Sequence, residues 1–470
     1  MPLPRICVLA LLLLGACAAP PESRSGRPLN VVFILSDNQG AWTLGCYGNK
    51  DIRSPNIDRL ASEGMRFTRC FSSNAVCSPT RATFLTGLLP SQHGIHCYLN
   101  ADEFQVGPDA RCLIREFRSL PKILAENGYA CGLSGKWHLG GNLTPQEGFT
   151  SWITMPHGHT TTFHGAEIVE DGKIRKEPGY LTEVWTDRAV RFIEENRSRP
   201  FFLFLAYNGP YGLGGSLLGG GRNRHSDYYA DKEIPSFPRE PMHPWLRDNK
   251  NYLNNVQAIR SYAAEVSAVD DGVGRVLEAL RARGLERDTL VVFSADQGWA
   301  GGQHGIWGMG DHTRPLTAFD DQIHIPMIWR HAGRIPAGAT SDLLMSNYDF
   351  LPTLLGYLGM KEAKPAGLPG RDFSTALRGE SGQTSDAVFY EFENTRAIRT
   401  GEWKLIRRFP NGPDELYDLK ADPGERRNLI GSGQADDLRR RLSEFFDRIA
   451  DPKYNLWRGG VSKVRRVTKP

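Results

Sequence analysis

The sequence lacks an excess of charge of either sign. Its 470 residues carry 57 Lys and Arg against 53 Asp and Glu, a net charge of +4, and 40% of residues are hydrophobic. This balance excludes a strongly basic nucleic-acid-binding protein and a disordered chain. Long apolar runs are also scarce, because only one, near the start, is long enough to question, which excludes a polytopic membrane protein. The length suits one large α/β domain with an appendage, or two to three ordinary domains.

The one apolar run predicts an export signal. Residues 6–14 form a short apolar core that follows a charged start and is too short to span a membrane. The tetrapeptide Leu14-Gly15-Ala16-Cys17 resembles a bacterial lipobox, which implies a lipoprotein signal peptide over residues 1–16 and acylation of Cys17. A flexible tether follows over residues 17–27. We therefore expect an exported bacterial protein that meets the membrane only through a lipid anchor, facing the periplasm or cell exterior; ordinary cleavage near Ala19 with release is the alternative.

Cysteine is absent from the last two thirds of the chain. Beyond the leader, six cysteines remain, all in the first third: Cys46, Cys70, Cys77, Cys97, Cys112 and Cys131. An exported protein can pair some of them, but the sequence does not define the connectivity.

Apolar runs alternate with helical patterns along residues 28–365. Runs without polar alternation are typical of strands covered on both faces, and apolar spacings of three and four over Ile259–Arg283 indicate an amphipathic helix. This order predicts an α/β catalytic domain with a large, mostly parallel sheet flanked by helices. The four strand-like runs are Asn30–Ser36, Pro200–Asn208, Thr289–Ala295 and Ile325–Arg330.

A different pattern begins after Gly370. Short strands are expected over Ala387–Glu391, Trp403–Arg408 and Glu415–Leu419, followed by a charged helix over Ala435–Ile449. We interpret residues 366–470 as a smaller C-terminal subdomain, an antiparallel sheet with one helix. Residues 211–224 form a glycine-rich loop too long for a simple turn, and such loops are usually functional or mobile.

A carboxylate followed by a carboxamide ends each of two predicted strands. Asp37-Asn38 follows the first strand and Asp296-Gln297 follows the third. The carboxyl ends of parallel strands meet at one edge of a sheet, where α/β proteins bind ligands. These oxygen donors suit Ca²⁺ or Mg²⁺ better than Zn²⁺. Ordinary turn chemistry is the alternative for either pair alone.

Cys77 stands just ahead of a predicted short helix. Ser78 is a good N-cap, Pro79 fits the first helical position, and Gly87 can end the helix. A helix N-terminus favours an anion, and Arg81 in the first turn adds a planar fork of donors that suits sulfate, phosphate or carboxylate. A buried small hydrophobe or half of a disulfide is the alternative for a lone cysteine here.

The segment Cys77-x-Pro79-x-Arg81, followed by Thr86-Gly87, closely resembles the signature of the sulfatase family, and the resemblance extends over most of residues 28–430. It implies an alkaline-phosphatase-like core and oxidation of Cys77 to formylglycine by a formylglycine-generating or anaerobic sulfatase-maturing enzyme. It further implies Ca²⁺, with Mg²⁺ as the alternative, bound by Asp37, Asn38, Asp296, Gln297 and modified Cys77. Arg81 would hold the formylglycine hydrate, and Lys136 and His138 would contact the sulfate and the diol, since residues two apart on an extended segment project to the same side.

Two positions depart from the family pattern. Tyr211 stands where the family has a histidine that protonates the leaving oxygen, and Met309 stands where it commonly has a sulfate-binding lysine. Tyrosine is a poorer acid than histidine at neutral pH. Nearby candidates for substrate binding are His304, His312 and Arg314, with Tyr211 itself, and we expect His312 to replace the missing acid.

The function that this resemblance implies, and that we expect, is that of an exported, calcium-dependent sulfatase that hydrolyses sulfate esters of carbohydrates to alcohol and inorganic sulfate. One alternative is a phosphate or phosphonate ester hydrolase on the same scaffold. Another is a non-catalytic protein that binds sulfated glycans, which Tyr211 and Met309 would explain but which would not need the complete maturation signal at Cys77.

Overall fold

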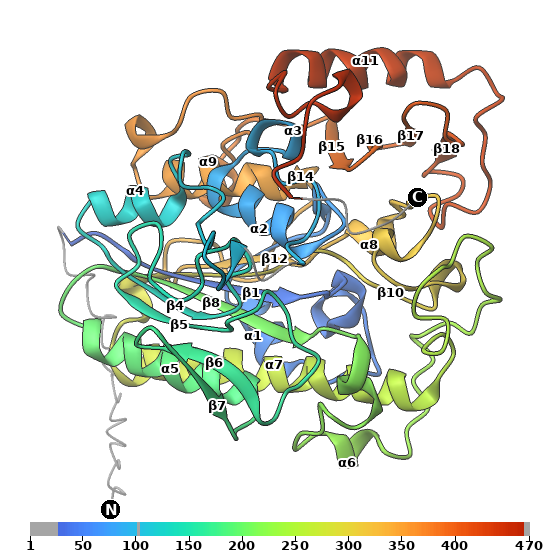
Figure 1. Cartoon of the computed structure of the whole chain (residues 1–470). Coiled ribbons are helices and arrows are strands. Elements are labelled where there is room, and N and C mark those ends of the chain that lie inside the picture. The colour runs from blue at the N-terminus through green and yellow to red at the C-terminus, as the bar shows by residue number, and fades with distance from the viewer. Residues whose placement is uncertain (1–26, 101–103, 465–470) are drawn as a thin grey trace, which may run out of the picture.

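A ten-stranded sheet forms the centre of the molecule (Figure 1). The computed structural model describes residues 27–100 and 104–464, so the predicted signal peptide and Cys17 lie outside the described residues. The strands run in the order β13-β2-β12-β9-β1-β8-β4-β5-β6-β7. Their bounds are β1 Asn30–Asp37, β2 Met65–Phe67, β4 Ala130–Gly135, β5 Ser151–Thr154, β6 Ala166–Glu170, β7 Lys173–Glu177, β8 Phe201–Pro210, β9 Thr289–Ala295, β12 Met327–Arg330 and β13 Ala339–Ser341.

The middle of this sheet is parallel. Strand β1 pairs with β9 on one side and β8 on the other, and β4 and β5 continue the parallel order. The carboxyl ends of these strands therefore meet at one edge. Strand β12 runs antiparallel to β9, and β6 and β7 are antiparallel at the far side. The largely parallel core predicted from the sequence is confirmed, with antiparallel strands towards its edges.

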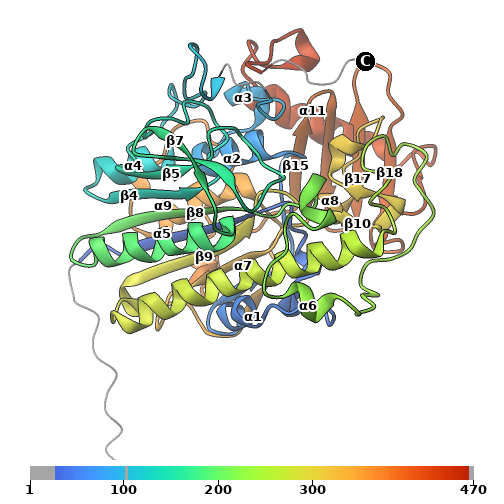
Figure 2. The ribbon, with the colours of Figure 1, turned by 60° about the horizontal axis from the view of Figure 1, so that its bottom comes forward.

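Helices cover both faces of the sheet, as Figures 1 and 2 show. Successive side chains of β1 point to opposite faces: Val31, Phe33 and Leu35 join one apolar cluster, and Val32 and Ile34 join the other. Helices α2 (Cys77–Thr86), α4 (Leu120–Glu126) and α9 (Phe350–Tyr357) pack on the first face. Helices α1 (Pro55–Ser62), α5 (Leu181–Asn196) and α7 (Val256–Ala282) pack on the second.

Shorter elements lie around these layers. The short helices are α3 Pro90–His93, α6 Ser226–Tyr229, α8 Asp320–Ile323 and α10 Ser374–Leu377, and two small sheets pair β3 Cys70–Phe71 with β14 Met345–Ser346 and β10 Ala300–Gly301 with β11 Trp307–Gly308. The glycine-rich loop is more ordered than expected, since a 3-10 helix covers Gly214–Leu218.

A second, four-stranded antiparallel sheet follows in the chain. It contains β15 (Ala387–Phe392), β16 (Thr395–Thr400), β17 (Trp403–Arg408) and β18 (Glu415–Asp418), and α11 (Ala435–Ile449) packs on it. The sequence predicted this subdomain but missed β16.

Buried polar contacts join the second sheet to the segments on both sides of α2. The Glu391 backbone N–H donates to the Ser73 carbonyl at 2.9 Å, and the Glu391 carboxylate accepts from the Ser91 N–H at 2.7 Å. The four-stranded sheet is therefore fixed against the chain that leads into Cys77 and against α3, which follows α2.

The cysteines of the described ranges are all free thiols, so the structure contains none of the disulfides that export would have permitted. Among the helices of the same ranges, none combines the length and the apolar character needed to cross a membrane.

Candidate active site

Cys77 begins helix α2 at the carboxyl edge of the sheet. Val76 is the N-cap residue, so the helix starts two residues earlier than predicted, and Ser78 does not cap it. The Ser78 hydroxyl instead accepts a hydrogen bond from the Leu99 N–H at 3.1 Å. Gly87 ends the helix in the left-handed conformation, φ 72°, as expected.

Four buried charges surround Cys77. The Arg81 guanidinium contacts Asp296 Oδ2 at 2.8 Å and Asp37 Oδ2 at 3.1 Å, and it also donates to the Lys136 carbonyl at 2.7 Å. The Lys136 ammonium pairs with Asp37, and all four side chains have no exposed surface. Two positive and two negative charges therefore balance in a site without bulk water, which is a condition for burying charge at all.

This environment keeps the Cys77 sulfur protonated. Its Sγ lies 3.7 Å from Asp37 Oδ1, and burial together with the Asp37 charge raises the pKa of the thiol to about 12. Burial and Asp37 also raise the pKa of Asp296, to about 6. Because the thiolate is the nucleophilic form of cysteine, an unmodified Cys77 is poorly suited to attack an ester at neutral pH.

Two carboxylates and the Cys77 sulfur converge on the same point. Candidate ligand atoms of Asp37, Cys77 and Asp296 lie within 4.8 Å of one another. The Gln297 side-chain amide faces Asn38 Oδ1 and Cys77 Sγ, while its buried Oε1 has no hydrogen-bond partner. An amide oxygen left unpaired in a buried cluster is costly unless a ligand satisfies it. The donor set therefore fits a hard cation such as Ca²⁺ or Mg²⁺.

Lys136 and His138 approach the cluster by a different route from the one predicted. The segment is not extended at His138, which has φ 58°, so strand alternation does not orient this side chain. Its Nε2 contacts the Leu99 carbonyl at 2.8 Å, and Nδ1 is buried without a partner. Burial, and then the Lys136 charge, hold the pKa of His138 well below its usual value. The imidazole is therefore neutral, with hydrogen on Nε2 and an acceptor at Nδ1.

Tyr211 and Met309 both lie at the cluster. The Tyr211 carbonyl accepts from the Asn38 amide at 2.7 Å, and the Lys136 ammonium lies 5.3 Å from the centroid of the tyrosine ring. Met309 Sδ lies 3.1 Å from the Gln297 amide nitrogen. The two positions that depart from the family pattern thus contact the residues that the sequence assigns to the metal and the sulfate.

The other three predicted substrate residues are each held by contacts of their own. His312 Nδ1 accepts from the Met309 N–H at 3.1 Å, so this ring lies beside the cluster. Arg314 donates to the carbonyls of Asp311 and Thr313 at 2.6 Å. His304 stacks on Phe319 with ring centroids 3.8 Å apart. The contacts found for Arg314 and His304 in the described chain include none of the Cys77 cluster.

The sequence interpretation missed His159. The centroid of its imidazole ring lies 6.0 Å from that of His138. The ring stacks over Tyr211 with centroids 6.4 Å apart, and the Tyr98 ring meets it edge-on at 6.3 Å. Burial and the Lys136 charge lower the pKa of His159 to about 4. A signal was present, because His159 follows β5, a parallel strand that ends at the same edge, but β5 is too short to stand out in the sequence.

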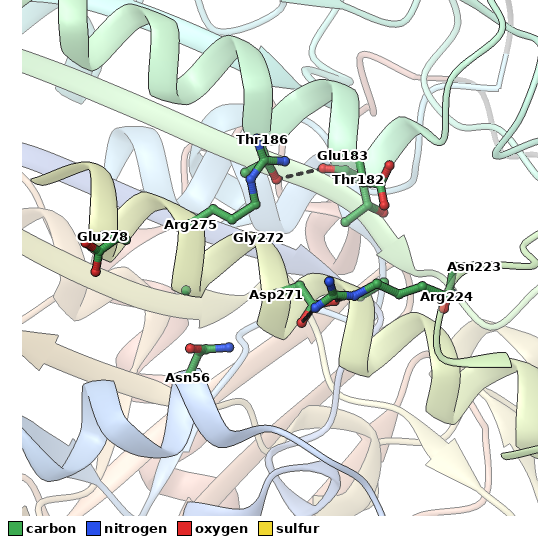
Figure 3. Close-up of a pocket in the computed structure, with 12 residues that line it drawn as sticks. Asn56, Thr182, Glu183, Thr186, Asn223, Arg224, Asp271, Gly272, Arg275 and Glu278 are labelled. Carbon is green, nitrogen blue, oxygen red and sulfur yellow. Dashed lines mark hydrogen bonds and ion pairs between the residues drawn. The ribbon is translucent and has the colours of Figure 1, made fainter. Parts of the chain in front are cut away.

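A polar groove of about 490 Å³ lies between α5 and α7 (Figure 3). Arg224 there pairs with Asp271 of α7, which also accepts from His225 at 2.5 Å. The residues that line the groove include none of the Cys77 cluster. The end of the glycine-rich loop is therefore fixed on the helix layer.

Two family models match this chain. The model described as sulfatase matches residues 29–360, and the model described as the C-terminal region of N-sulphoglucosamine sulphohydrolase matches residues 306–451.

Similar proteins include an N-acetylglucosamine-6-O-sulfatase of Bacteroides thetaiotaomicron, 28% identical over 93% of this chain and 89% of the relative. An N-acetylgalactosamine-6-sulfatase of Rattus norvegicus is 30% identical over 84% of this chain and 74% of its own length. Among solved structures, one described as a complex with its substrate D-glucosamine-2-N,6-O-disulfate superposes with a TM-score of 0.72 at 24% identity, covering 90% of this chain and 98% of the other. This last likeness shows the shared fold.

Proposed function

This chain belongs to the sulfatase family, as the match over residues 29–360 shows, and from this premise we propose that it hydrolyses sulfate esters of carbohydrates to an alcohol and inorganic sulfate. The observation that carries the proposal is Cys77 at the start of α2, surrounded by the buried charges of Asp37, Asp296, Arg81 and Lys136. The names of the relatives in B. thetaiotaomicron and rat support a 6-sulfated N-acetylhexosamine as the sulfated unit.

We propose that Cys77 is converted to formylglycine by a maturing enzyme. The high pKa of the thiol supports this, because the unmodified side chain stays protonated. A hydrated aldehyde would supply two hydroxyl groups on one carbon, one to attack sulfur and one to expel sulfate by C–O cleavage.

Asp37, Asn38, Asp296 and Gln297 would hold Ca²⁺, with Mg²⁺ as the alternative. The bound cation would supply positive charge beside the nucleophile and the sulfate. Arg81 keeps the two carboxylates in place through its fork of donors. It lies four residues after Cys77 on α2, so the two side chains project from the same face of the helix. Lys136 adds the positive charge that a sulfate group requires.

His138 would accept a proton during sulfate release. Its Nε2–H donates to Leu99, so Nδ1 is the free acceptor, buried next to the charged cluster. Protonation of the leaving sugar oxygen needs a second group. His159, beside Tyr211, has a better position for this than His312, whose Nδ1 is already used by the Met309 N–H.

We also propose that the protein is exported and anchored to a membrane by a lipid. The lipobox at Cys17 supports a membrane-anchored lipoprotein that faces the periplasm or cell exterior, where sulfated glycans are accessible to a surface hydrolase. Labelling with a radioactive fatty acid, compared between the natural chain and Cys17→Ser, tests the anchor. Equal labelling of both chains would contradict it.

The function is tested on protein produced together with a formylglycine-generating or anaerobic sulfatase-maturing enzyme. Mass spectrometry of the peptide that contains residue 77 should show replacement of the thiol by an aldehyde, and Cys77→Ala provides the control. Sulfate release is then measured from 6-sulfated N-acetylglucosamine and from the matched phosphate ester. An aldehyde-bearing protein that releases phosphate faster than sulfate, or neither, would contradict the proposal.

A further inference from the structure

A cavity of about 390 Å³ opens where three distant parts of the chain meet. Cys97 contributes from the core, Glu393 and Asn394 from the turn between β15 and β16, and Phe409 from the end of β17. Ser462 and Val464, near the end of the described chain, also line it. The volume lies within the range of about 300–1,000 Å³ found for small-molecule sites. We call this cavity the flanking pocket.

The flanking pocket adjoins the Cys77 site. Cys97 is two residues from Leu99, so their α-carbons are at most about 7 Å apart. The Leu99 N–H donates to Ser78, the neighbour of Cys77, and the Leu99 carbonyl accepts from His138. Tyr98, between them, faces His159. One short segment therefore lines the pocket at one end and contacts the catalytic helix at the other.

An aromatic side chain is fixed in the pocket with its ring accessible. Phe409 is 41% exposed, and its ring stacks on Trp457 with centroids 5.5 Å apart. Two hydrogen bonds hold the Phe409 backbone. The Phe409 N–H donates to the Asn394 carbonyl at 2.8 Å, and the Phe409 carbonyl accepts from the Asn394 side-chain amide at 3.1 Å. The part of the ring that stays accessible offers a stacking face to a ligand with an apolar side.

The polar lining complements the ring. Asn394 and Ser462 offer an amide and a hydroxyl, and Glu393 adds a carboxylate. An apolar face with convergent hydrogen-bonding groups suits the C–H face and the hydroxyls of a pyranose. The negative charge of Glu393 disfavours a second sulfate at this place.

We propose that the flanking pocket is a subsite for an unsulfated sugar unit linked to the sulfated unit at residue 77, so that the enzyme recognises a sulfated oligosaccharide. The inference rests on the proposed sulfatase function and adds a second sugar to its substrate. Phe409 provides the stacking surface, and Glu393 selects against sulfation of that second sugar.

The test compares two substrates on matured protein: N-acetylglucosamine 6-sulfate, and disaccharides in which the same sulfated unit is linked to galactose through its reducing or its non-reducing side. We expect kcat/KM to be higher for one of the disaccharides. Phe409→Ala should lower kcat/KM for that disaccharide by about tenfold and leave the monosaccharide unchanged. Ile174→Ala, which removes an exposed apolar side chain on β7, is the matched control.

Glu393→Gln and Asn394→Ala provide independent variants if Phe409→Ala folds poorly. Glu393→Gln should improve turnover of a disaccharide that carries a second sulfate, and Asn394→Ala should weaken binding of the unsulfated disaccharide alone. An unchanged ratio of disaccharide to monosaccharide turnover in all three variants would overturn the subsite while leaving the sulfatase function intact. Absence of sulfate release from every substrate by aldehyde-bearing protein would instead overturn the proposed function.

Discussion

Replacing His159 by Gln tests which group protonates the leaving oxygen. Glutamine keeps hydrogen-bonding capacity at this position but cannot carry the proton of an imidazolium. His159 lies within one ring contact of both His138 and Tyr211, next to Lys136. General acid catalysis contributes about 10²- to 10⁴-fold. We therefore expect His159→Gln to lower kcat/KM for N-acetylglucosamine 6-sulfate by that factor.

The dependence on the leaving group separates acid catalysis from a structural role. The oxygen of a sugar alcohol needs a proton as it leaves, whereas 4-nitrophenolate departs readily without one. His159→Gln should therefore lower kcat/KM for 4-nitrophenyl sulfate by less than about tenfold. A parallel loss with both substrates would indicate damage to the site and would refute the assignment.

The pH profile gives a second readout. Burial and Lys136 hold the pKa of His159 at about 4, so the imidazolium form declines as pH rises above that value. For the free enzyme, kcat/KM with sugar sulfates should therefore fall with rising pH on the side above about 4, and His159→Gln should lose this limb. His312→Gln, at a ring fixed by the Met309 N–H, is the comparison. If His312→Gln gives the loss specific to sugar sulfates, then His312 is the acid and His159 is not.

Four further outcomes follow from other parts of the structure. Removing bound metal with EGTA should abolish turnover. Atomic emission of protein not treated with EGTA should find less calcium in Asp296→Asn than in the natural protein, and equal calcium would contradict the ligand assignment. Cys77→Ser lacks the second hydroxyl, so it should release no sulfate after any first transfer, and steady multiple turnover would exclude the formylglycine route. Phe84→Ala removes a fully buried ring packed against Phe33 and Phe350 and should cost about 3–5 kcal/mol in urea unfolding. Asp270→Ala leaves the Asn56 and Ile57 N–H groups at the start of α1 unpaired and should cost about 3 kcal/mol without changing KM.

The central strands and the metal-facing carboxylates could be predicted because their signals are local. Strands β1, β8 and β9 are buried on both faces and read as continuous apolar runs, and a residue that ends a parallel strand must lie at the common edge. Asp37 and Asp296 are therefore placed together by topology, although 258 positions separate Asn38 from Asp296 in their hydrogen bond.

Contacts made by short or irregular segments could not be predicted in the same way. Strand β5 has four residues, so His159 after it gave no periodic signal. His138 has φ 58°, and tertiary packing fixes its ring, since Gly158 lies so close that a β-carbon there would come within 1.8 Å of Cδ2. Ser78 looked like a helix cap, but Leu99 uses its hydroxyl, and Leu99 is distant in sequence. In each case the partner that decides the geometry lies on another segment.

The glycine-rich loop acquires a physical role through its supports. Gly212 has φ 71°, its carbonyl accepts from Trp307 Nε1 at 2.9 Å, and a β-carbon there would lie 2.7 Å from the Trp299 ring. Tyr262 of α7 stacks on the same Trp299 and donates to the Asn38 carbonyl at 2.6 Å. The loop, the two tryptophans and Tyr262 therefore form one packed unit behind Asn38 and Tyr211. A longer side chain at residue 212 would displace this unit, so glycine there serves the geometry of the site rather than the mobility of a lid.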